Sequence, residues 1–190
     1  DISFRHMPPI YWKYLLVTAL FGIGCSSNAF LILRMQEAGG SLETTILIYS
    51  AFNLVAALVS YPAGYLSDHW GRRTMLLISF LVFLIAYLGF ALFQNSILIS
   101  GLFVVYGVYQ GIFRSVGKAF AADLIRTELR ATGIGWYSAT VGLFQLVAGI
   151  VAGELWDHIG HAAVFYNGAS FAIVGIIALL LLVPKGIGNK

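Results

Sequence analysis

The chain has 190 residues, of which 59% are hydrophobic and 10% are charged, with a net charge of +3 and a mean hydropathy of +0.87. Soluble domains carry roughly 25% charged residues, so this composition excludes an ordinary water-soluble protein. The single cysteine, Cys25, excludes an intramolecular disulfide and a multi-cysteine metal site.

Six apolar runs follow one another along the chain. Each is long enough to cross a hydrocarbon core of about 30 Å, which needs about 20 helical residues. The segments between them are short and rich in polar residues and glycine, which leaves no room for a soluble domain. The sequence therefore predicts an all-α membrane protein whose transmembrane helices cover residues 11–33, 45–66, 74–93, 96–121, 132–152 and 163–183.

Basic residues fall unevenly on the two sides of these spans. With the amino terminus inside, Arg34 alone lies outside and Arg114 lies within a span. Cytoplasmic loops are enriched in lysine and arginine, so the sequence predicts an inner (plasma) membrane protein with both termini in the cytoplasm. This bias accounts for the positive net charge without a nucleic-acid partner. The cytoplasmic basic residues would be Arg5, Lys13, Arg72, Arg73, Lys118, Arg126, Arg130, Lys185 and Lys190.

One short sequence occurs twice. GYLSDHWG at residues 64–71 returns as GELWDHIG at residues 153–160, and only the first copy is followed by two arginines. Three spans separate the copies, which places them on opposite faces of the membrane. This arrangement predicts two inverted three-helix repeats. The expected organisation is a cytoplasmic linker at 1–10, repeats at 11–93 and 94–183, and a cytoplasmic tail at 184–190.

The first copy carries a family resemblance. With its two arginines it resembles the cytoplasmic loop signature of the major facilitator superfamily, Gly-x-Leu-x-Asp-Arg-x-Gly-Arg-Arg/Lys, from which His69 departs. Helix number, inverted repeats and internal termini also resemble one six-helix half of such a transporter. The segment at 4–14 resembles the end of the linker between halves, which favours the carboxy-terminal half. The resemblance implies that a partner half completes the protein.

Five residues of the first copy form a candidate gating motif. Gly64 and Gly71 are expected to allow close backbone approach and a tight reversal. Asp68 is expected to accept hydrogen bonds from the start of the next helix. The resemblance implies that this corner, with Arg72 and Arg73, acts as a latch that breaks and re-forms as two halves rock. The simpler alternative is a capped turn that anchors both arginines to lipid phosphates.

Polar residues inside spans are the candidate substrate ligands. The resemblance implies that the first and fourth helices of a half line the central cavity, the second and fifth form the interface between halves, and the third and sixth face lipid. Ser27 and Asn28 lie in the first span, and Tyr106, Gln110 and Arg114 share one face of the fourth. Ser27 and Asn28 could instead pack against a helix or unwind the span locally. Gln145 and Asn53 are expected as interhelical hydrogen-bond partners.

Arg114 lies on the order of 10 Å from the end of its helix, where an arginine costs a few kcal/mol. One alternative is that it snorkels to the headgroups. Lys118, one turn nearer the interface, occupies that route and is expected to contact lipid phosphates. Two like charges at this spacing need a counter-charge, either an anionic substrate group or a carboxylate from a facing half.

These features predict half of a secondary transporter that moves a small solute through the lipid bilayer by alternating access, and Arg114 favours an anionic solute. A non-transporting six-helix scaffold or sensor, and a half-size carrier that works as a homodimer, remain alternatives. No nucleophile elbow, phosphate-binding loop or metal-ligand spacing indicates an enzyme or a cofactor. No Asp or Glu lies well inside a span, so the coupling ion, the direction of transport and the solute stay open.

Overall fold

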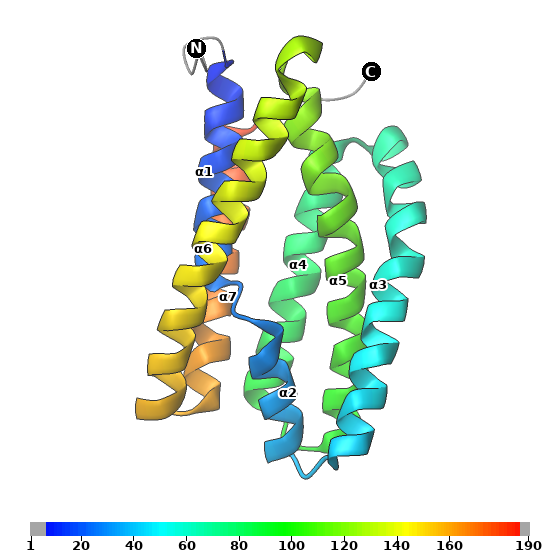
Figure 1. Cartoon of the computed structure of the whole chain (residues 1–190), viewed down its shortest axis with the longest axis vertical. Helices are drawn as coiled ribbons and strands as arrows, with labels where there is room; N and C mark the ends of the chain where they lie inside the picture. The colour runs from blue at the N-terminus through cyan, green and yellow to red at the C-terminus, as the bar shows by residue number, and fades with distance from the viewer. Residues whose placement is uncertain (1–6, 187–190) are drawn as a thin grey trace.

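The computed structural model describes residues 7–186 and contains six membrane-length spans, which confirms the predicted all-α class. All the spans run along the long axis of one bundle (Figure 1). The ends of the expected linker and tail, at 1–6 and 187–190, lie outside the described residues. The helices are α1 (Pro9–Gly24), α2 (Asn28–Glu37), α3 (Leu42–Trp70), α4 (Arg72–Leu92), α5 (Ser96–Asp123), α6 (Arg130–His158) and α7 (His161–Leu182), with a short 3-10 turn, η2 (Thr127–Leu129), before α6.

The first span is interrupted. The span predicted at 11–33 is present but consists of two helices, because α1 ends at Gly24 and α2 begins at Asn28, so the alternative of local unwinding near Ser27 and Asn28 is confirmed. Ser27 caps the new helix, and its Oγ accepts a hydrogen bond of 3.3 Å from the Ala29 N–H. At Gly24, an added Cβ would lie 2.8 Å from the Gly168 carbonyl oxygen of α7. The absence of a side chain therefore allows the two backbones to approach closely where the first span breaks.

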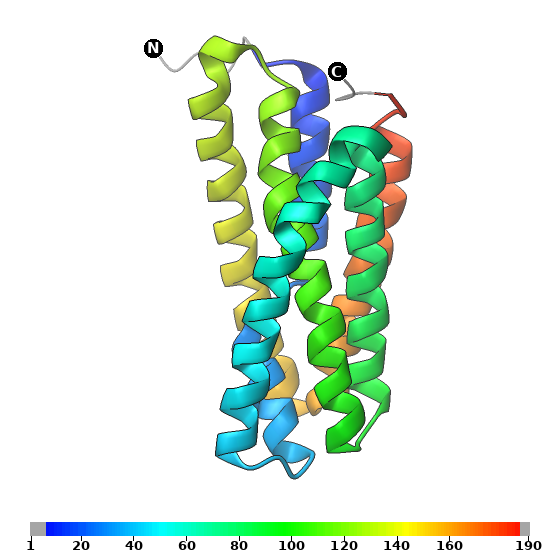
Figure 2. The same ribbon diagram turned by 90° about the vertical axis from the view of Figure 1, so that its right-hand side faces the viewer.

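The two halves of the first span pack against different neighbours. α1 packs on α6 and α7, whereas α2 approaches α3 and α5. Figure 1 shows α2 displaced sideways from the axis of α1, in the lower part of the bundle. α4 and α5 pack together, and Figure 2 shows α3 tilted across α5. The interruption therefore lies at the centre of the bundle, between its two groups of helices.

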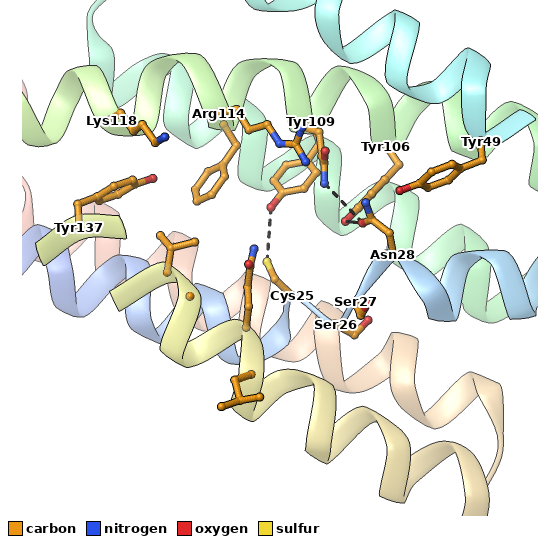
Figure 3. Close-up of a pocket in the computed structure, with 16 residues that line it drawn as sticks. Cys25, Ser26, Ser27, Asn28, Tyr49, Tyr106, Tyr109, Arg114, Lys118 and Tyr137 are labelled. Atoms are coloured by element: carbon orange, nitrogen blue, oxygen red, sulfur yellow. Dashed lines mark hydrogen bonds between the residues drawn. The ribbon is translucent and has the colours of Figure 1, made fainter. Parts of the chain in front are cut away.

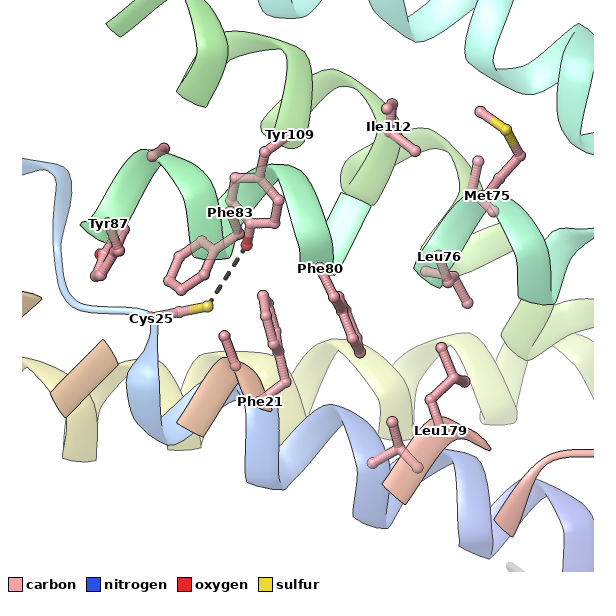
Figure 4. Packing of buried hydrophobic residues seen from close by; sticks show 14 of the residues in the cluster. Phe21, Cys25, Met75, Leu76, Phe80, Phe83, Tyr87, Tyr109, Ile112 and Leu179 are labelled. Atoms are coloured by element: carbon pink, nitrogen blue, oxygen red, sulfur yellow. Dashed lines mark hydrogen bonds between the residues drawn. The ribbon is translucent and has the colours of Figure 1, made fainter. Parts of the chain in front are cut away.

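Aromatic side chains fill the core around this interruption. The Phe21 ring of α1 stacks on the Phe80 ring of α4, with centroids 3.9 Å apart and planes at 8°. Phe83 stacks on Tyr87 and meets Tyr109 edge to face (Figure 4). Rings in such offset and edge-to-face pairs pack densely, and each pair adds about 0.5–1.5 kcal/mol beyond the burial of area. The core thus holds α1, α4 and α5 rigidly beside the break.

The spans α3 and α6 are the least buried of the six. Both expose large apolar side chains, whereas most of the inner surface of α4 is covered by α5 and α7. In a bilayer such side chains can face lipid or another apolar helix bundle. Exposed apolar side chains on these two spans include Leu47, Leu54, Leu58, Leu143, Leu146 and Ile150.

The two copies of the repeated sequence form similar turns. Gly71 ends the first copy with φ 88°, and Gly160 ends the second with φ 122°. Glycine adopts this region without the steric strain that a Cβ would cause. α4 begins immediately after Gly71 and α7 immediately after Gly160, at opposite ends of the bundle (Figure 1).

Candidate functional site

A cavity of about 720 Å³ opens beside the interrupted span. Residues of the break and of α3, α5 and α6 line it, and Figure 3 shows their side chains converging from several helices. Ligand pockets commonly have volumes of about 300–1,000 Å³. All five residues predicted as substrate ligands line this cavity, namely Ser27, Asn28, Tyr106, Gln110 and Arg114.

A small hydrogen-bond network connects α2 with α5. The Tyr106 hydroxyl donates to Asn28 Oδ1 at 3.1 Å, and Gln110 Nε2 lies 3.5 Å from the same oxygen. The interruption brings the first turn of α2 to this position, since Asn28 is its first residue. The Gln110 Oε1 atom is buried and has no hydrogen-bond partner within the described chain. It is therefore an acceptor that a solute or a water molecule in the cavity can satisfy.

The cavity is electropositive. Lys118 and Arg114 line it, and their side chains extend along α5 in the direction of Tyr106 and Asn28 (Figure 3). None of the ion pairs formed among residues 7–186 involves either cation, and no Asp or Glu lines the cavity. Both side chains are exposed, and two positive charges without a carboxylate beside them attract an anion to the cavity.

Lys118 is exposed and its side chain also lines the cavity, so its predicted contact with lipid phosphates stays a prediction beside a second role in the cavity. The sequence already indicated this position in the cavity, because Lys118 lies four residues after Arg114 and therefore on the same face of the helix. Gln145 also lines the cavity, and within residues 7–186 no hydrogen bond joins it to another helix. Exposed Asn53 donates to the Tyr49 carbonyl in its own helix at 2.8 Å, so its interhelical role toward a partner half stays a prediction.

Two tyrosines hold the interrupted backbone in place. Ser26 Oγ lies 2.9 Å from the Tyr87 hydroxyl of α4, in a buried environment. Cys25 Sγ lies 3.5 Å from the Tyr109 hydroxyl of α5. Sequence reasoning did not identify Tyr87, because it lies in a charge-free span with no polar pattern. These contacts fix the segment from which Ser27 and Asn28 reach the cavity.

The candidate gating motif forms a second polar cluster, at the end of the bundle where α4 begins. Arg72 Nη2 lies 2.8 Å from Asp68 Oδ1, and Arg72 Nε donates to Asp123 Oδ2 at 3.0 Å. A third donor of the same guanidinium, Nη1, bonds Ser67 Oγ. Arg72 thus ties the end of α3 to the end of α5. Arg73 instead donates to the Leu180 carbonyl near the end of α7 at 3.2 Å.

Two details of this motif differ from expectation. Asp68 lies within the last turn of α3, and no side chain caps the start of α4, so its predicted capping role is wrong. Its carboxylate pairs with Arg72 instead. An added Cβ on Gly64 would meet nothing within 4 Å, so Gly64 makes no close contact within the described chain. The expected tight reversal is found at Gly71, whose φ is positive.

Six apolar spans around a polar cavity form the kind of structure that membrane transporters use. The family described as Major Facilitator Superfamily matches residues 14–189. The chain therefore belongs to the major facilitator superfamily, whose members are integral membrane proteins and generally not enzymes.

Relatives in archaea and bacteria support this assignment. The chain is 33% identical to an uncharacterized MFS-type transporter of Methanocaldococcus jannaschii over 95% of its length and 47% of the relative. It is 26% identical to an uncharacterized MFS-type transporter of Bacillus subtilis over 97% of its length and 48% of the relative. The tetracenomycin C resistance and export protein of Streptomyces glaucescens is 29% identical over 77% of this chain and 27% of that protein. The chain thus spans less than half the length of these relatives.

Proposed function

We propose that this chain is one six-helix half of a secondary transporter, and that a small solute crosses the membrane through the cavity by alternating access. The observation that carries this proposal is the convergence of the interrupted first span and α5 on one cavity with unpaired polar groups. Discontinuous spans that present polar groups in the middle of a bundle are a recurring substrate site in transporters.

The solute that best fits the cavity is a small organic anion. Arg114 and Lys118 supply two positive charges without a carboxylate partner, and Asn28 and Gln110 supply neutral hydrogen-bonding groups. A cationic solute would meet repulsion in the same place. The Streptomyces relative is named as an export protein for tetracenomycin C, so export is a direction of transport to test and tetracenomycin C is a compound to test.

A partner half would complete the cavity. The surfaces of α3 and α6 flank it and expose apolar side chains, as an interface between two helix bundles requires. The relatives have more than twice the matched length, which favours a second half in the same polypeptide. A second copy of this chain is the alternative, and the mass of the native gene product distinguishes the two.

The contacts of Arg72 support a gating role for its corner. In this proposal the repeats at 11–93 and 94–183 are inverted, both termini are cytoplasmic, and the Arg72 cluster closes the cytoplasmic end. The guanidinium is mostly buried, with 17% of its side chain exposed, and bonds both Asp68 and Asp123. Partly desolvated pairs of this kind are stronger than exposed ones, so breaking them is a defined step when the bundle rearranges.

The test is solute flux in liposomes that contain the full-length protein. The panel comprises small organic anions, neutral analogues of equal size, organic cations and tetracenomycin C. We expect flux of at least one anion, and a decrease of about tenfold or more in the Arg114→Ala variant, equivalent to about 1.4 kcal/mol of binding. Arg126→Ala, which removes an exposed cation outside the cavity, is the matched control.

Three outcomes decide the proposal. Flux of an anion that falls in Arg114→Ala and Lys118→Gln but not in Arg126→Ala supports it. Normal anion flux in Arg114→Ala removes the assigned site. A folded protein that moves no solute of the panel favours a non-transporting membrane scaffold or sensor.

A further inference from the structure

The repeated sequence places different residues at equivalent positions. The residue after the first copy is Arg72, the first residue of α4, and the residue after the second copy is His161, the first residue of α7. Each follows a glycine with positive φ. If the chain consists of two three-helix repeats, both residues begin the third span of a repeat.

The contacts of these two residues are also equivalent. Arg72 Nε bonds Asp123 Oδ2 at 3.0 Å, and Asp123 is the last residue of α5. His161 Nδ1 lies 3.1 Å from Glu37 Oε2, and Glu37 is the last residue of α2. In both cases the start of a third span contacts an acidic residue at the end of a first span, in the other repeat. The two contacts lie at opposite ends of the bundle.

We infer that Glu37 and His161 form a proton-binding site and a second interlock, equivalent to the Arg72–Asp123 contact at the other end. Arginine keeps its charge at every physiological pH, whereas histidine changes charge between about pH 5 and 8. The Arg72 interlock is therefore permanent in charge, and the His161 interlock strengthens when the imidazole binds a proton. His161 is only partly exposed to solvent, with 27% of its side chain accessible.

A second cation, Arg34, lies beside Glu37. Arg34 Nη1 lies 3.6 Å from the same Oε2 atom that faces His161. Arg34 is buried, and its Nε donates to the Phe90 carbonyl at the end of α4 at 3.0 Å. This guanidinium is therefore fixed in place and acts as a constant positive charge beside the carboxylate. Glu37 therefore lies between Arg34, which is held in place, and the imidazole of His161.

The other elements around His161 add little charge. α6 contributes the Trp156 ring, whose centroid is 6.2 Å from that of the imidazole. α4 presents backbone carbonyls that Arg34 occupies, and the charged residue of α1, Lys13, lies at the far end of the bundle. The remaining Asp, Glu, His, Lys and Arg residues at this end of residues 7–186 are Glu43, Glu154, Asp157 and His158, and α7 itself adds Tyr166. His158 lies 3.6 Å from Glu154 within its own helix.

The interlock has a mechanical consequence. α2 is separated from α1 by the interruption, and Asn28 at its other end lines the cavity. A contact that ties the end of α2 to α7 therefore restrains the helix that carries a cavity residue. If the proposed transport function is correct, proton binding at this end favours the closed arrangement of that end.

The experiment is a pair of double-mutant cycles on the full-length protein in nanodiscs, with apparent melting temperature as the readout. The first cycle uses Glu37→Gln, His161→Gln and both, at pH 5.5 and pH 8. A free histidine side chain changes charge between these two pH values, whereas a free glutamate side chain does not. We expect a coupling of about 1–3 °C at pH 5.5 that falls by at least half at pH 8.

The second cycle uses Glu154→Gln and His158→Gln, an exposed pair within one helix with 75% and 74% of the side chains exposed. We expect no measurable coupling there, because solvent screens such a pair. In addition, His161→Arg is expected to keep the coupling to Glu37 at both pH values. Equal coupling of Glu37 and His161 at the two pH values, or none at either, overturns the inference.

This readout does not depend on transport. If the coupling between Glu37 and His161 depends on pH as expected but no flux is found, the inference of a proton-binding site stands and only the transport proposal is contradicted. Where flux is measured, the rate of flux through the wild-type protein is expected to depend on the pH on the side of the membrane where His161 lies. The His161→Arg variant is expected to show a weaker dependence. A pH profile that stays unchanged in His161→Arg, with a positive cycle, removes the mechanical consequence.

Discussion

Ser26 Oγ and the Tyr87 hydroxyl lie 2.9 Å apart in the buried centre of the bundle, although 61 residues separate them in the chain. This contact joins the interrupted first span to the middle of α4, where the surrounding side chains of that helix are mostly apolar. It explains how an irregular segment keeps a defined position, since its polar side chain is satisfied by a rigid aromatic residue.

The first prediction concerns this contact. Tyr87→Phe removes the hydroxyl and leaves Ser26 without its partner, which costs about 1–3 kcal/mol. We expect a lower apparent melting temperature, by roughly 2–12 °C at about 2–4 °C per kcal/mol, and a higher KM for the transported solute. Tyr166→Phe, at an exposed tyrosine of α7, is the control and should change neither quantity. Equal effects of both substitutions would show that the contact has no special role.

The second prediction separates the two carboxylates around Arg72. Asp123 has 25% of its side chain exposed and Asp68 has 61%, so solvent screens the Asp68 pair more strongly. Asp123→Ala is therefore expected to lower the apparent melting temperature more than Asp68→Ala, with about 1 kcal/mol or less for the latter. Thermal unfolding at low and high salt measures both. A larger loss in Asp68→Ala contradicts the assignment of Asp123 as the main partner.

The third prediction concerns glycines. An added Cβ on Gly24 would lie 2.8 Å from a carbonyl oxygen of α7, whereas one on Gly64 would meet nothing within 4 Å. Gly24→Ala is expected to destabilise the protein by about 1–3 kcal/mol through overpacking. Gly64→Ala is expected to leave the stability of this half unchanged. If Gly64→Ala lowers flux at unchanged stability, Gly64 contacts the partner half. If it unfolds the protein, the packing at this corner differs from the structure described.

The fourth prediction concerns Arg34, whose guanidinium donates to the carbonyls of Phe90 and Phe93 where α4 ends. Arg34→Met keeps most of the apolar stem but leaves these carbonyls and Glu37 without a cation. We expect a loss of about 1–3 kcal/mol per buried group left unpaired, measured by thermal unfolding. Gln36→Met, at an exposed residue of the same helix, is the control. Unchanged stability in Arg34→Met would mean that water replaces the guanidinium at these carbonyls.

The fifth prediction tests the charge preference of the cavity. Asn28→Asp keeps the oxygen that Tyr106 bonds but adds a negative charge to a cavity lined by Arg114 and Lys118. We expect the KM for an anionic solute to rise by about tenfold or more, because the carboxylate competes for both cations. Asn28→Ser, which keeps a polar group without charge, should have a smaller effect. A lower KM for the anion in Asn28→Asp is incompatible with anion binding at Arg114.

Hydropathy in the sequence was sufficient to predict six spans, because the bilayer requires each span to be long, apolar and helical. The common face of Tyr106, Gln110 and Arg114 was predictable for a similar reason, since helical periodicity places residues four apart on one side. The inclusion of Lys118 in the cavity follows the same rule. Whether a long flexible side chain such as that of Lys118 extends into the cavity depends on the neighbouring helices, which periodicity does not describe.

The sequence by itself thus determined the number of spans, the family and the helix face that carries the candidate solute ligands. Only the tertiary structure decided where the first span breaks, which tyrosines hold that break, and which residues Arg72 and His161 contact. The physical reason is the range of the interactions. Hydropathy and periodicity act over one or two helical turns, whereas the contact of His161 with Glu37 joins residues more than a hundred positions apart and exists only when α2 and α7 are packed into one bundle.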